Sequence, residues 1–247
     1  MAEENRYIHR NPIIRRYHLK RLSIVVNKIG LAARNEDSKN SIFLDVGCGD
    51  GTYELLLKRE YGYLIGLDIA LGDLRKARDH IRCRQNVEFI LADTEYLPFR
   101  DLSVHVVLCS EVLEHLRDPP KALLELSRIS SGKLLLTVPI SNISRKIARI
   151  LQYNHRLDEI EVTIGHVSMH GAQWWINAVK EVFGKRIIKY HVKADYLYAM
   201  AEPFTSILAN AKNIVLIEMI DKALTILEKV LSHPRFANQL IITVSSE

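Results

Sequence analysis

Long uncharged apolar runs are absent from this sequence of 247 residues. No stretch reaches the about 18 apolar residues that a membrane-spanning helix needs, so such a helix is not expected. Cysteine is scarce: the three cysteines form no CxxC pair, and this odd number predicts free thiols in a reducing compartment. The N-terminal segment MAEENRYIHRNP opens with acidic residues and lacks the apolar core of a signal peptide. We therefore expect a cytoplasmic protein.

Repeats, low-complexity tracts and long Gly/Ser linkers are also absent, which predicts a single compact unit. A hydrophobic content of 48% and a charged content of 26% are ordinary for a globular protein. The net charge of +5 and the pI near 9.0 permit an anionic partner such as a phosphate, a nucleic acid or a membrane surface. Many surfaces without such a partner are equally basic, so charge alone assigns none.

Apolar segments of strand composition alternate with segments of helical periodicity from residue 42 onward. Strands are expected at 42–46, 63–68, 87–92, 104–110 and 133–139, and helices at 13–33, 52–60, 71–83 and 119–130. This order predicts an α/β fold with a parallel sheet, right-handed crossovers and helices on both faces.

The C-terminal third has a different pattern. Residues 172–184 predict a helix that ends at Gly184, and residues 185–194 predict a strand. Helical stretches fill an insertion at 196–232, and the segment LIITVSS at 240–246 predicts a last strand. Because this strand returns after a helical insertion, we expect it to lie antiparallel at the sheet edge.

The stretch FLDVGCGDG at residues 43–51 places Gly47, Gly49 and Gly51 on the turn that leaves the first strand. Without Cβ atoms the turn can be tight, and a ligand can lie against the main chain. Dinucleotide sites space their glycines G-x-G-x-x-G, whereas the spacing here is G-x-G-x-G. Asp45 lies just before the first glycine, where a carboxylate suits a cationic amino group better than a pyrophosphate. The pattern therefore disfavours NAD and ATP.

Two further acids follow the next two strands. Asp68 ends the second strand, where it can accept hydrogen bonds from both hydroxyls of a ribose, and Asp93 follows the third, where it can accept from an adenine amino group. Ligands of open parallel sheets bind beyond the carboxyl ends of the strands. With Asp45, these acids describe a nucleoside that bears an amino-acid tail. The alternative is that the acids cap loops and the glycines only form turns.

Four stretches, FLDVGCGDG, IGLDIA, FILADTEYLPFRD and VVLCSEVLEHLRDP, resemble the successive motifs of class I S-adenosylmethionine (SAM) methyltransferases, in order and in spacing. The resemblance is strongest to the UbiE/UbiG-like (type 11) group, which acts on small molecules. It covers about residues 40–140 well and the flanking regions only in outline.

The resemblance implies a doubly wound, Rossmann-like, mostly parallel seven-stranded sheet with an antiparallel edge strand. It also implies one domain, 1–247. Its parts are an N-terminal helical lid at 1–40, a SAM-binding core at 41–140, and a substrate-side region at 141–247 that contains the insertion.

By the same resemblance, the cofactor is SAM. The residues expected to bind it are Asp45, Gly47, Cys48, Gly49, Gly51, Asp68, Ile69, Asp93, Thr94 and Ser110. The glycines would cradle the methionine part and Asp45 would orient its amino group. The ribose would lie on Asp68, and Ser110 would face the sulfonium methyl.

The segment SEVLEHLRDPP holds the next candidates. If residues 111–116 form a helical turn, Glu111, Glu114 and His115 share one face and could bind a hard cation such as Mg²⁺. Some ubiquinone-pathway and small-RNA methyltransferases use a similar E-x-x-E-H as metal ligands. The alternative, which we favour, is that Glu111 lines the pocket, Glu114 caps or pairs, and His115 forms hydrogen bonds within the core. No metal is therefore assigned.

A histidine after the fifth strand, His166, is a candidate general base, because related enzymes place a G-H-V-like segment over the substrate. The resemblance thus implies His166, Glu111 and His115 as catalytic candidates. Like any loop histidine, His166 can also be structural or merely exposed.

The flanking segments should decide the substrate. The N-terminal helix combines apolar residues with basic residues such as Arg15, Arg16 and Arg21, and is expected to cover the cofactor or to rest on an anionic membrane. The insertion is largely apolar and could pack on the sheet edge or enclose a lipophilic substrate.

We therefore expect methyl transfer to an oxygen or carbon of a small, possibly lipophilic molecule. An RNA or protein methyltransferase and a catalytically silent SAM-binding protein remain as alternatives. Nucleic acid is not favoured, since the sequence shows no aromatic-basic interleaving and no D/N-P-P-Y/F signature after the fourth strand. The sequence does not indicate an oligomeric state.

Overall fold

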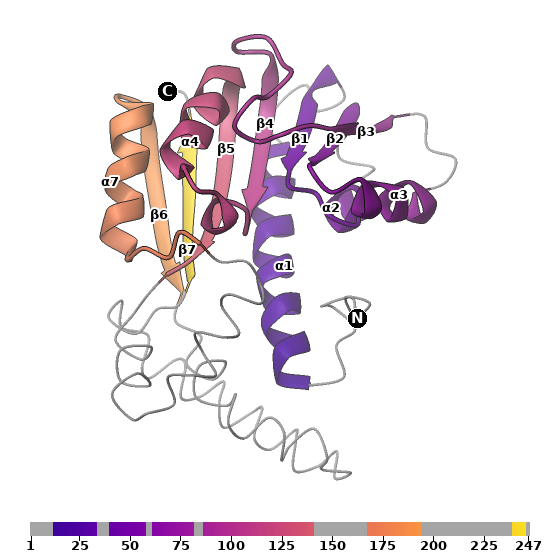
Figure 1. Ribbon diagram of the computed structural model, residues 1–247, viewed down its shortest axis with the longest axis horizontal. Helices are drawn as coiled ribbons and strands as arrows, with labels where there is room; N and C mark the ends of the chain where they lie inside the picture. Colours follow the sequence, from indigo (N-terminus) through magenta and orange to yellow (C-terminus); the bar gives the residue numbers. More distant parts are fainter. Residues whose placement is uncertain are drawn as a thin grey trace.

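The computed structural model describes residues 12–33, 40–57, 61–81, 86–140, 167–193 and 239–245. The helices are α1 (Pro12–Ala33), α2 (Thr52–Leu57), α3 (Leu71–His80), α4 (Pro119–Ile129) and α7 (Ala172–Phe183), and a short 3₁₀ turn forms η2 (Leu113–His115). The strands are β1 (Ile42–Val46), β2 (Tyr63–Asp68), β3 (Val87–Leu91), β4 (Val104–Ser110), β5 (Ser130–Pro139), β6 (Ile187–Lys193) and β7 (Gln239–Ser245) (Figure 1). The helical stretches predicted at 196–232 lie outside the described residues.

The strands form one seven-stranded sheet in the order β3-β2-β1-β4-β5-β7-β6. Strands β1 to β5 are parallel, and β7 is antiparallel to both of its neighbours, β5 and β6. The predicted α/β class and the antiparallel direction of the last strand are therefore confirmed. Strand β7 lies one strand inside the edge, between β5 and β6, and β6 is the edge strand. In the chain, α7 comes between β5 and β6, and β7 is the last of these elements.

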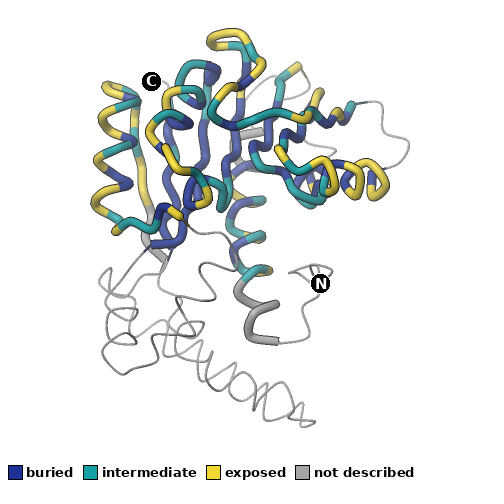
Figure 2. Tube along the Cα trace, in the orientation of Figure 1, coloured by how far each residue is buried: buried dark blue, intermediate teal, exposed yellow. Residues whose placement is uncertain are grey.

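Two apolar layers cover the two faces of the sheet. On one face, α4 packs over β5 and α7 over β7 and β6, through residues such as Leu123, Leu126, Trp175 and Val179 (Figure 1). The other face is covered by α1, α2 and α3. Figure 2 shows the result: the central strands are buried, and exposed residues lie on the outer sides of α3, α4 and α7, in loops and on the edge strand β6. Successive residues of a strand point to opposite faces, so Val46 belongs to the first layer and Phe43 to the second.

Local sequence signals explain where the helices on the first face begin and end. Asp118 caps α4 by accepting a hydrogen bond from the backbone N–H of Lys121, and Pro119 occupies the first turn, where its missing N–H costs nothing. Gly184 ends α7 with a positive φ of 57°, as the sequence predicts. Among the described helices, none combines the length and the apolar character that would be needed to cross a membrane.

Candidate cofactor and active site

The glycine turn lies directly against the end of β2. The backbone N–H groups of Gly47 and Cys48 donate to the Leu67 carbonyl, at 2.7 and 3.0 Å. Gly47, Gly49 and Gly51 have φ values of 77°, 55° and 75°, a region that other residues rarely adopt. A side chain on Gly47 would overlap Val112, whereas a Cβ on Gly49 would meet nothing within 4 Å. The turn is therefore packed on one side and open on the other, and Gly49 borders the open side.

Asp68 holds this turn by accepting backbone hydrogen bonds, and its carboxylate can still accept hydrogen bonds from a ligand. Its Oδ2 accepts from the Gly49 N–H at 2.9 Å and its Oδ1 from the Ala70 N–H at 2.8 Å. Each carboxylate oxygen has two lone pairs, so each can accept one further bond from a ligand. Ile69, which follows, is 70% exposed. The sequence predicts that Asp68 and Ile69 contact the cofactor, with the ribose on Asp68.

Asp93 and Thr94 lie at the end of the neighbouring strand. The Ala92 N–H donates to the Asp68 carbonyl at 3.1 Å, which joins the ends of β2 and β3. Asp93 Oδ1 accepts from the Glu95 N–H at 2.9 Å, and Thr94 is buried. The structure thus brings the glycine turn, Asp68 and Asp93 together at the carboxyl ends of the strands.

Asp45 is the least ordinary residue of this group. Its side chain is 1% exposed, and neither carboxylate oxygen has a hydrogen-bond partner in the described part of the chain. Burial raises the pKa of Asp45 well above its ordinary value, and the charges of Glu54 and Asp68 raise it further. A buried carboxyl without a partner is costly, so a cationic ligand group that approached it would gain a strong interaction.

Glu54 of α2 is a site residue that the sequence motifs do not indicate. It is fully buried, and neither of its carboxylate oxygens meets a partner on another described residue. Its pKa is raised to about 8, mainly by burial. A hydrogen bond from its own backbone N–H opposes this shift, and the charge of Asp50 adds to it. A signal is nevertheless present in the sequence, because Glu54 lies on the same side of the short helix as the buried residue Leu57, three positions later.

Hydroxyl groups connect the end of β4 to β5. Ser110 Oγ lies 2.9 Å from Thr137 Oγ1 and 3.3 Å from the Tyr53 hydroxyl. Thr137 donates to Glu111 Oε1 at 3.1 Å. Tyr53 is buried, as expected for a packing residue, but its hydroxyl also reaches the residue predicted to face the methyl group.

Glu111 is held by residues from three other elements. Its Oε2 lies 2.7 Å from the guanidinium of Arg21 on α1, and the Gln239 side-chain amide of β7 donates to its Oε1 at 3.3 Å. Its backbone N–H donates to the Thr137 carbonyl at 2.9 Å, and its φ of 58° is unusual for a residue other than glycine. Arg21, expected on a basic surface of the N-terminal helix, is only 3% exposed, so the membrane-facing interpretation is wrong for this residue.

The other members of the E-x-x-E-H segment diverge. The helical turn at 111–116 that a shared face would require is limited to a 3₁₀ turn at residues 113–115. Glu114 is completely buried, and the His115 side chain is 39% exposed. A core position for His115 is therefore wrong. Within the described ranges, no group of three or more His, Cys, Asp or Glu side chains is placed to hold a metal ion. The residues present also fit one poorly, because the Glu111 carboxylate is already paired with a guanidinium.

The segment after the gap at 141–166 returns to this turn. The backbone N–H groups of Val167 and Ser168 both donate to the Glu114 carbonyl at 2.9 Å, and Ser168 Oγ donates to the Leu116 carbonyl at 2.6 Å. His166, the predicted base, lies immediately before and outside the described residues. His170 is described, and its ring stacks on Trp174 with centroids 3.6 Å apart.

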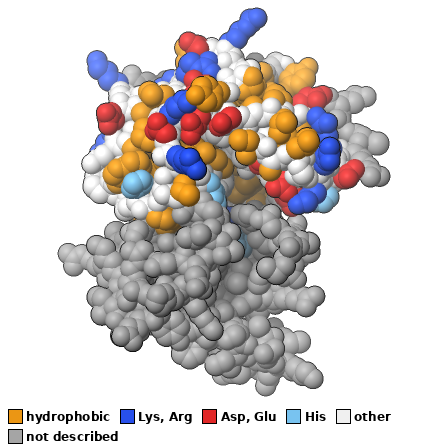
Figure 3. All heavy atoms as spheres, in the orientation of Figure 1, with side chains coloured by type: hydrophobic (Ala, Val, Ile, Leu, Met, Phe, Trp, Pro, Cys, Tyr) orange, Lys and Arg blue, Asp and Glu red, His pale blue; other side chains and the backbone are white. Residues whose placement is uncertain are grey.

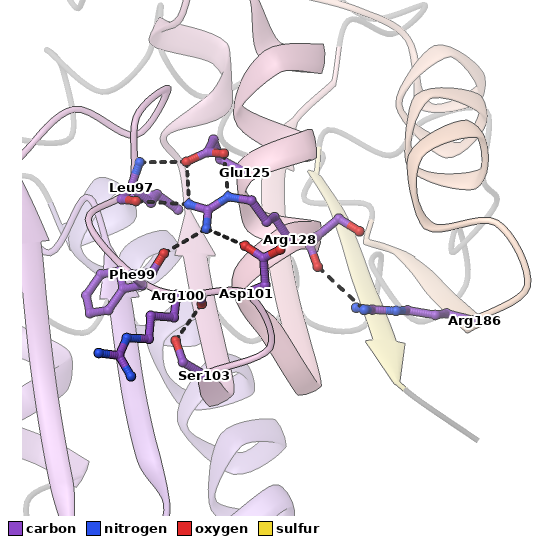
Figure 4. A network of polar contacts seen from close by, with 9 residues as sticks. Leu97, Phe99, Arg100, Asp101, Ser103, Glu125, Arg128 and Arg186 are labelled. Carbon is purple, nitrogen blue, oxygen red and sulfur yellow. Dashed lines mark hydrogen bonds and ion pairs between the residues drawn. The ribbon is translucent and has the colours of Figure 1, made fainter.

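A second polar network fixes the loop between β3 and β4 (Figure 4). Arg128 of α4 donates to the carbonyls of Leu97 and Phe99, at 3.0 and 2.7 Å, and to the carboxylates of Glu125 and Asp101. Glu125 in turn accepts from the Leu97 N–H at 2.8 Å. Because this loop follows Asp93 and Thr94, α4 holds the segment next to the expected adenine position.

Acidic and basic side chains of the described residues are interspersed on the face shown in Figure 3. The pair of Lys121 and Glu95 is an example, with Lys121 also lying 3.5 Å over the centre of the Tyr96 ring. On this face, mixed charge of this kind does not form the single-sign surface typical of nucleic-acid binding.

Comparisons with known proteins agree with this geometry. Residues 44–136 match the family described as a methyltransferase domain. An uncharacterized methyltransferase of Schizosaccharomyces pombe is 34% identical over 143 residues, 54% of this chain and 51% of that protein. The demethylmenaquinone methyltransferase of Renibacterium salmoninarum is 35% identical over 95 residues, 38% of this chain and 39% of that protein.

Among solved structures, the geranyl diphosphate C-methyltransferase of Streptomyces coelicolor superimposes with a TM-score of 0.62 at 15% identity, over 100% of this chain and 84% of that one. At this identity the likeness concerns the fold. The chain spans about half of the length of the yeast relative and less of the bacterial one.

Proposed function

We propose that this chain, whose residues 44–136 match a methyltransferase-domain family, binds SAM and transfers its methyl group to an oxygen or carbon of a small, lipophilic molecule. The observation that carries the proposal is the buried carboxyl of Asp45. It lacks a partner in the described part of the chain and lies just before a glycine turn that is open at Gly49. The amino group of a methionine tail is a cation that would suit this position.

The remaining residues fit the same ligand. Asp68 has free acceptor capacity for the ribose hydroxyls, and Asp93 and Thr94 stand at the end of the next strand. Bound SAM would supply both the methyl group and its leaving group, so the chain has to hold and orient the reactants and exclude water. In the geranyl diphosphate C-methyltransferase, the solved complex contains S-adenosylhomocysteine on a similar fold.

Residues around Ser110 would shape the end of the pocket where the methyl group is expected. The contacts among Ser110, Thr137 and Tyr53 orient these hydroxyls before any ligand arrives. The Arg21 guanidinium compensates the charge of Glu111, which makes Glu111 a positioning residue rather than a free base. His166 remains our candidate base for an oxygen nucleophile, and the proposal for it rests on sequence alone.

The class of acceptor is supported by relatives and by composition. One relative is named for a quinone precursor, demethylmenaquinone, and others are ubiquinone biosynthesis O-methyltransferases of Coxiella burnetii. The sequence of the insertion at 196–232 is largely apolar, as a pocket for a lipophilic molecule would require. Peripheral membrane contact is a secondary proposal on the same ground.

Calorimetric titration tests the cofactor. SAM and S-adenosylhomocysteine should bind with micromolar-scale dissociation constants, whereas NAD and ATP should not bind. The acceptor is tested by methyl transfer from radiolabelled SAM to a cell extract separated into lipid, small-molecule, protein and RNA fractions. Label in the lipid or small-molecule fraction is the expected result. Label confined to RNA or protein would contradict the proposed acceptor, and SAM binding without any transfer would indicate a silent binding protein.

A further inference from the structure

The unusual feature of the site is that it buries two carboxyls side by side instead of one. Asp45 of β1 is paired in register with Gly66 of β2. A Cβ atom on Gly66 would lie 2.8 Å from Glu54 Oε1 and 2.6 Å from the Phe89 ring. The missing side chain at Gly66 therefore makes room for the Glu54 carboxyl next to the strand position of Asp45. Asp45 is 1% exposed and Glu54 is 0% exposed.

The charged groups that act on this pair are acids as well. Asp68, at the end of β2, acts on Asp45, and Asp50, in the glycine turn, acts on Glu54. The Cys48 thiol in the same turn is buried, and burial raises its pKa, so it adds no charge near neutral pH. The apolar residues of α1 and α3 that pack into this layer include Val25, Ile29, Leu74 and Ala77. The buried cation of α1, Arg21, forms its ion pair with Glu111. Among the described residues, no cationic side chain donates a hydrogen bond to either carboxyl.

We propose that Asp45 and Glu54 form one proton-linked site that binds the cationic tail of the cofactor with release of a proton. The inference rests on the proposed function and deepens it. Before binding, two adjacent buried carboxyls cannot both ionise cheaply, so they retain a proton between them. The ammonium group of the ligand then supplies the positive charge that the proton supplied. Charges and protons balance: a protonated pair and a cation give an ionised pair, the bound cation and one proton in solvent.

The pair also distinguishes the cofactor from its product. SAM carries a sulfonium charge in addition to its ammonium, whereas S-adenosylhomocysteine has lost that charge with the methyl group. An ionised buried pair attracts the doubly cationic tail more strongly than the singly cationic one. The acidic pair therefore favours release of the product in exchange for fresh cofactor, a specificity role for Glu54 that goes beyond holding the ligand in place.

The test counts protons by calorimetry of the full chain with SAM, in two buffers of different ionisation enthalpy, between pH 5.5 and 7.0. In this window the α-amino group of the ligand stays protonated, because its ordinary pKa is about 7.7–8.0. The wild type should release about one proton per SAM bound. Its affinity should rise with pH by up to about tenfold per unit, which is the limit for one linked proton.

Matched variants test whether the released proton comes from Asp45 and Glu54 or from another acid. Glu54→Gln and Asp45→Asn should each release clearly less than the wild type, and each should narrow the ratio between SAM and S-adenosylhomocysteine affinity. Glu88→Gln, an identical change at an exposed position of β3, should behave as the wild type.

The experiment distinguishes failure of this inference from failure of the proposed function. Absence of SAM binding to the wild type at every pH would overturn both proposals. SAM binding without proton release and without pH dependence would overturn this inference alone. Release of as many protons by Glu54→Gln as by the wild type would likewise overturn this inference and leave the proposed function intact. Should one variant fail to fold, the wild-type proton count and the other variant decide.

Discussion

Acidic side chains gather in two regions on opposite faces of the sheet, and the two regions differ in burial and in partners. Asp101 is exposed and Glu125 is partly buried, whereas Asp45 and Glu54 are fully buried. Glu125 and Asp101 lie beside Arg128 at the α4 side, where each acid meets the guanidinium and the loop carbonyls occupy its other donors. On the face covered by α1, α2 and α3, Asp45 and Glu54 are more deeply buried and lack such a partner among the described residues.

The difference separates structural acids from functional ones. Arg128 lowers the pKa of Glu125, as expected for an acid that stabilises the folded chain in its ionised form. Burial raises the pKa of Asp45 and Glu54, so their ionised forms cost stability, as is common for acids of functional sites. The burial of Asp45 and Glu54 next to the open glycine turn, without a cationic partner among the described residues, is what supports a ligand role for them.

The largest effect should come from placing a side chain on the open side of the glycine turn. Gly49→Val should reduce SAM affinity at least about 100-fold, because a β-branched residue fits φ of 55° badly and its methyl groups enter the space left for the ligand. Calorimetric titration measures the loss. Gly184→Val is the matched control, since Gly184 has a φ of 57° with nothing within 4 Å of a Cβ atom and lies far along the chain at the end of α7. Equal loss in both variants would show that strain, not the ligand space, is responsible.

The next effect concerns the ribose. Asp68→Ala removes the acceptor of two expected hydrogen bonds, each worth about 1.5–3 kcal/mol with a charged partner. The dissociation constant for SAM should therefore rise about 100-fold or more, as titration calorimetry can measure. Asp73→Ala, which removes an acid that pairs with Lys76 on α3, should leave the affinity unchanged. Unchanged affinity in Asp68→Ala would refute the ribose assignment.

Removing the Arg128 guanidinium from its network should reduce the stability of the fold more than the affinity for SAM. Arg128→Met removes the side-chain donor of the Leu97 and Phe99 carbonyls and the cationic partner of Glu125, and should lower the free energy of unfolding by about 1–3 kcal/mol. Urea denaturation measures this loss. Arg128→Lys should recover little, because an ammonium cannot reproduce the forked contacts of a guanidinium. A variant as stable as the wild type would remove the contrast between the two faces.

Without ligand, the buried pair of Asp45 and Glu54 should make the folded chain less stable as the pH rises. The pKa of Glu54 is raised from 4.5 to about 8 in the folded chain, so the folded state binds more protons than the unfolded state between these values. Its contribution to stability is therefore fully present below pH 4.5 and is lost as the pH rises toward 8. The melting temperature of the wild type should fall by several degrees from about pH 5 to about pH 8, and that of Glu54→Gln by less, since the amide stays neutral. Scanning calorimetry without ligand measures both melting temperatures. An equal fall in the wild type and in Glu54→Gln would contradict this prediction.

The smallest effect is expected from chelation. Because Arg21, Thr137 and Gln239 already occupy the Glu111 carboxylate, excess EDTA should leave both SAM binding and methyl transfer unchanged. Loss of transfer with retained SAM binding would instead support a cation at Glu111, Glu114 and His115. Glu114→Gln should then reproduce that loss.

Much of the fold and part of the site could be predicted from the sequence. The limits of β1, β2 and β4 match the predicted strands, because short apolar runs bounded by polar or glycine residues are a strong local signal. The acids after successive strands are identifiable for a similar reason, since parallel strands bring their carboxyl ends together. The partner of Glu111 could not be found in this way. Arg21 lies in a basic helical stretch that looks like a surface, and only tertiary packing places its guanidinium beside Glu111 at the end of β4.

The place of β7 could not be predicted either, since antiparallel direction does not decide which neighbours a strand has. Its place has a consequence for the order in which the chain can fold. Within the described residues, β6 has β7 as its sheet neighbour, and β7 follows β6 by a long intervening segment of sequence. During synthesis, β6 therefore leaves the ribosome before the strand that it pairs with, while β1 to β5 can already form their parallel ladder. The sheet has to remain open at β5 until the last strand arrives, so completion of the domain is timed by its C-terminal strand.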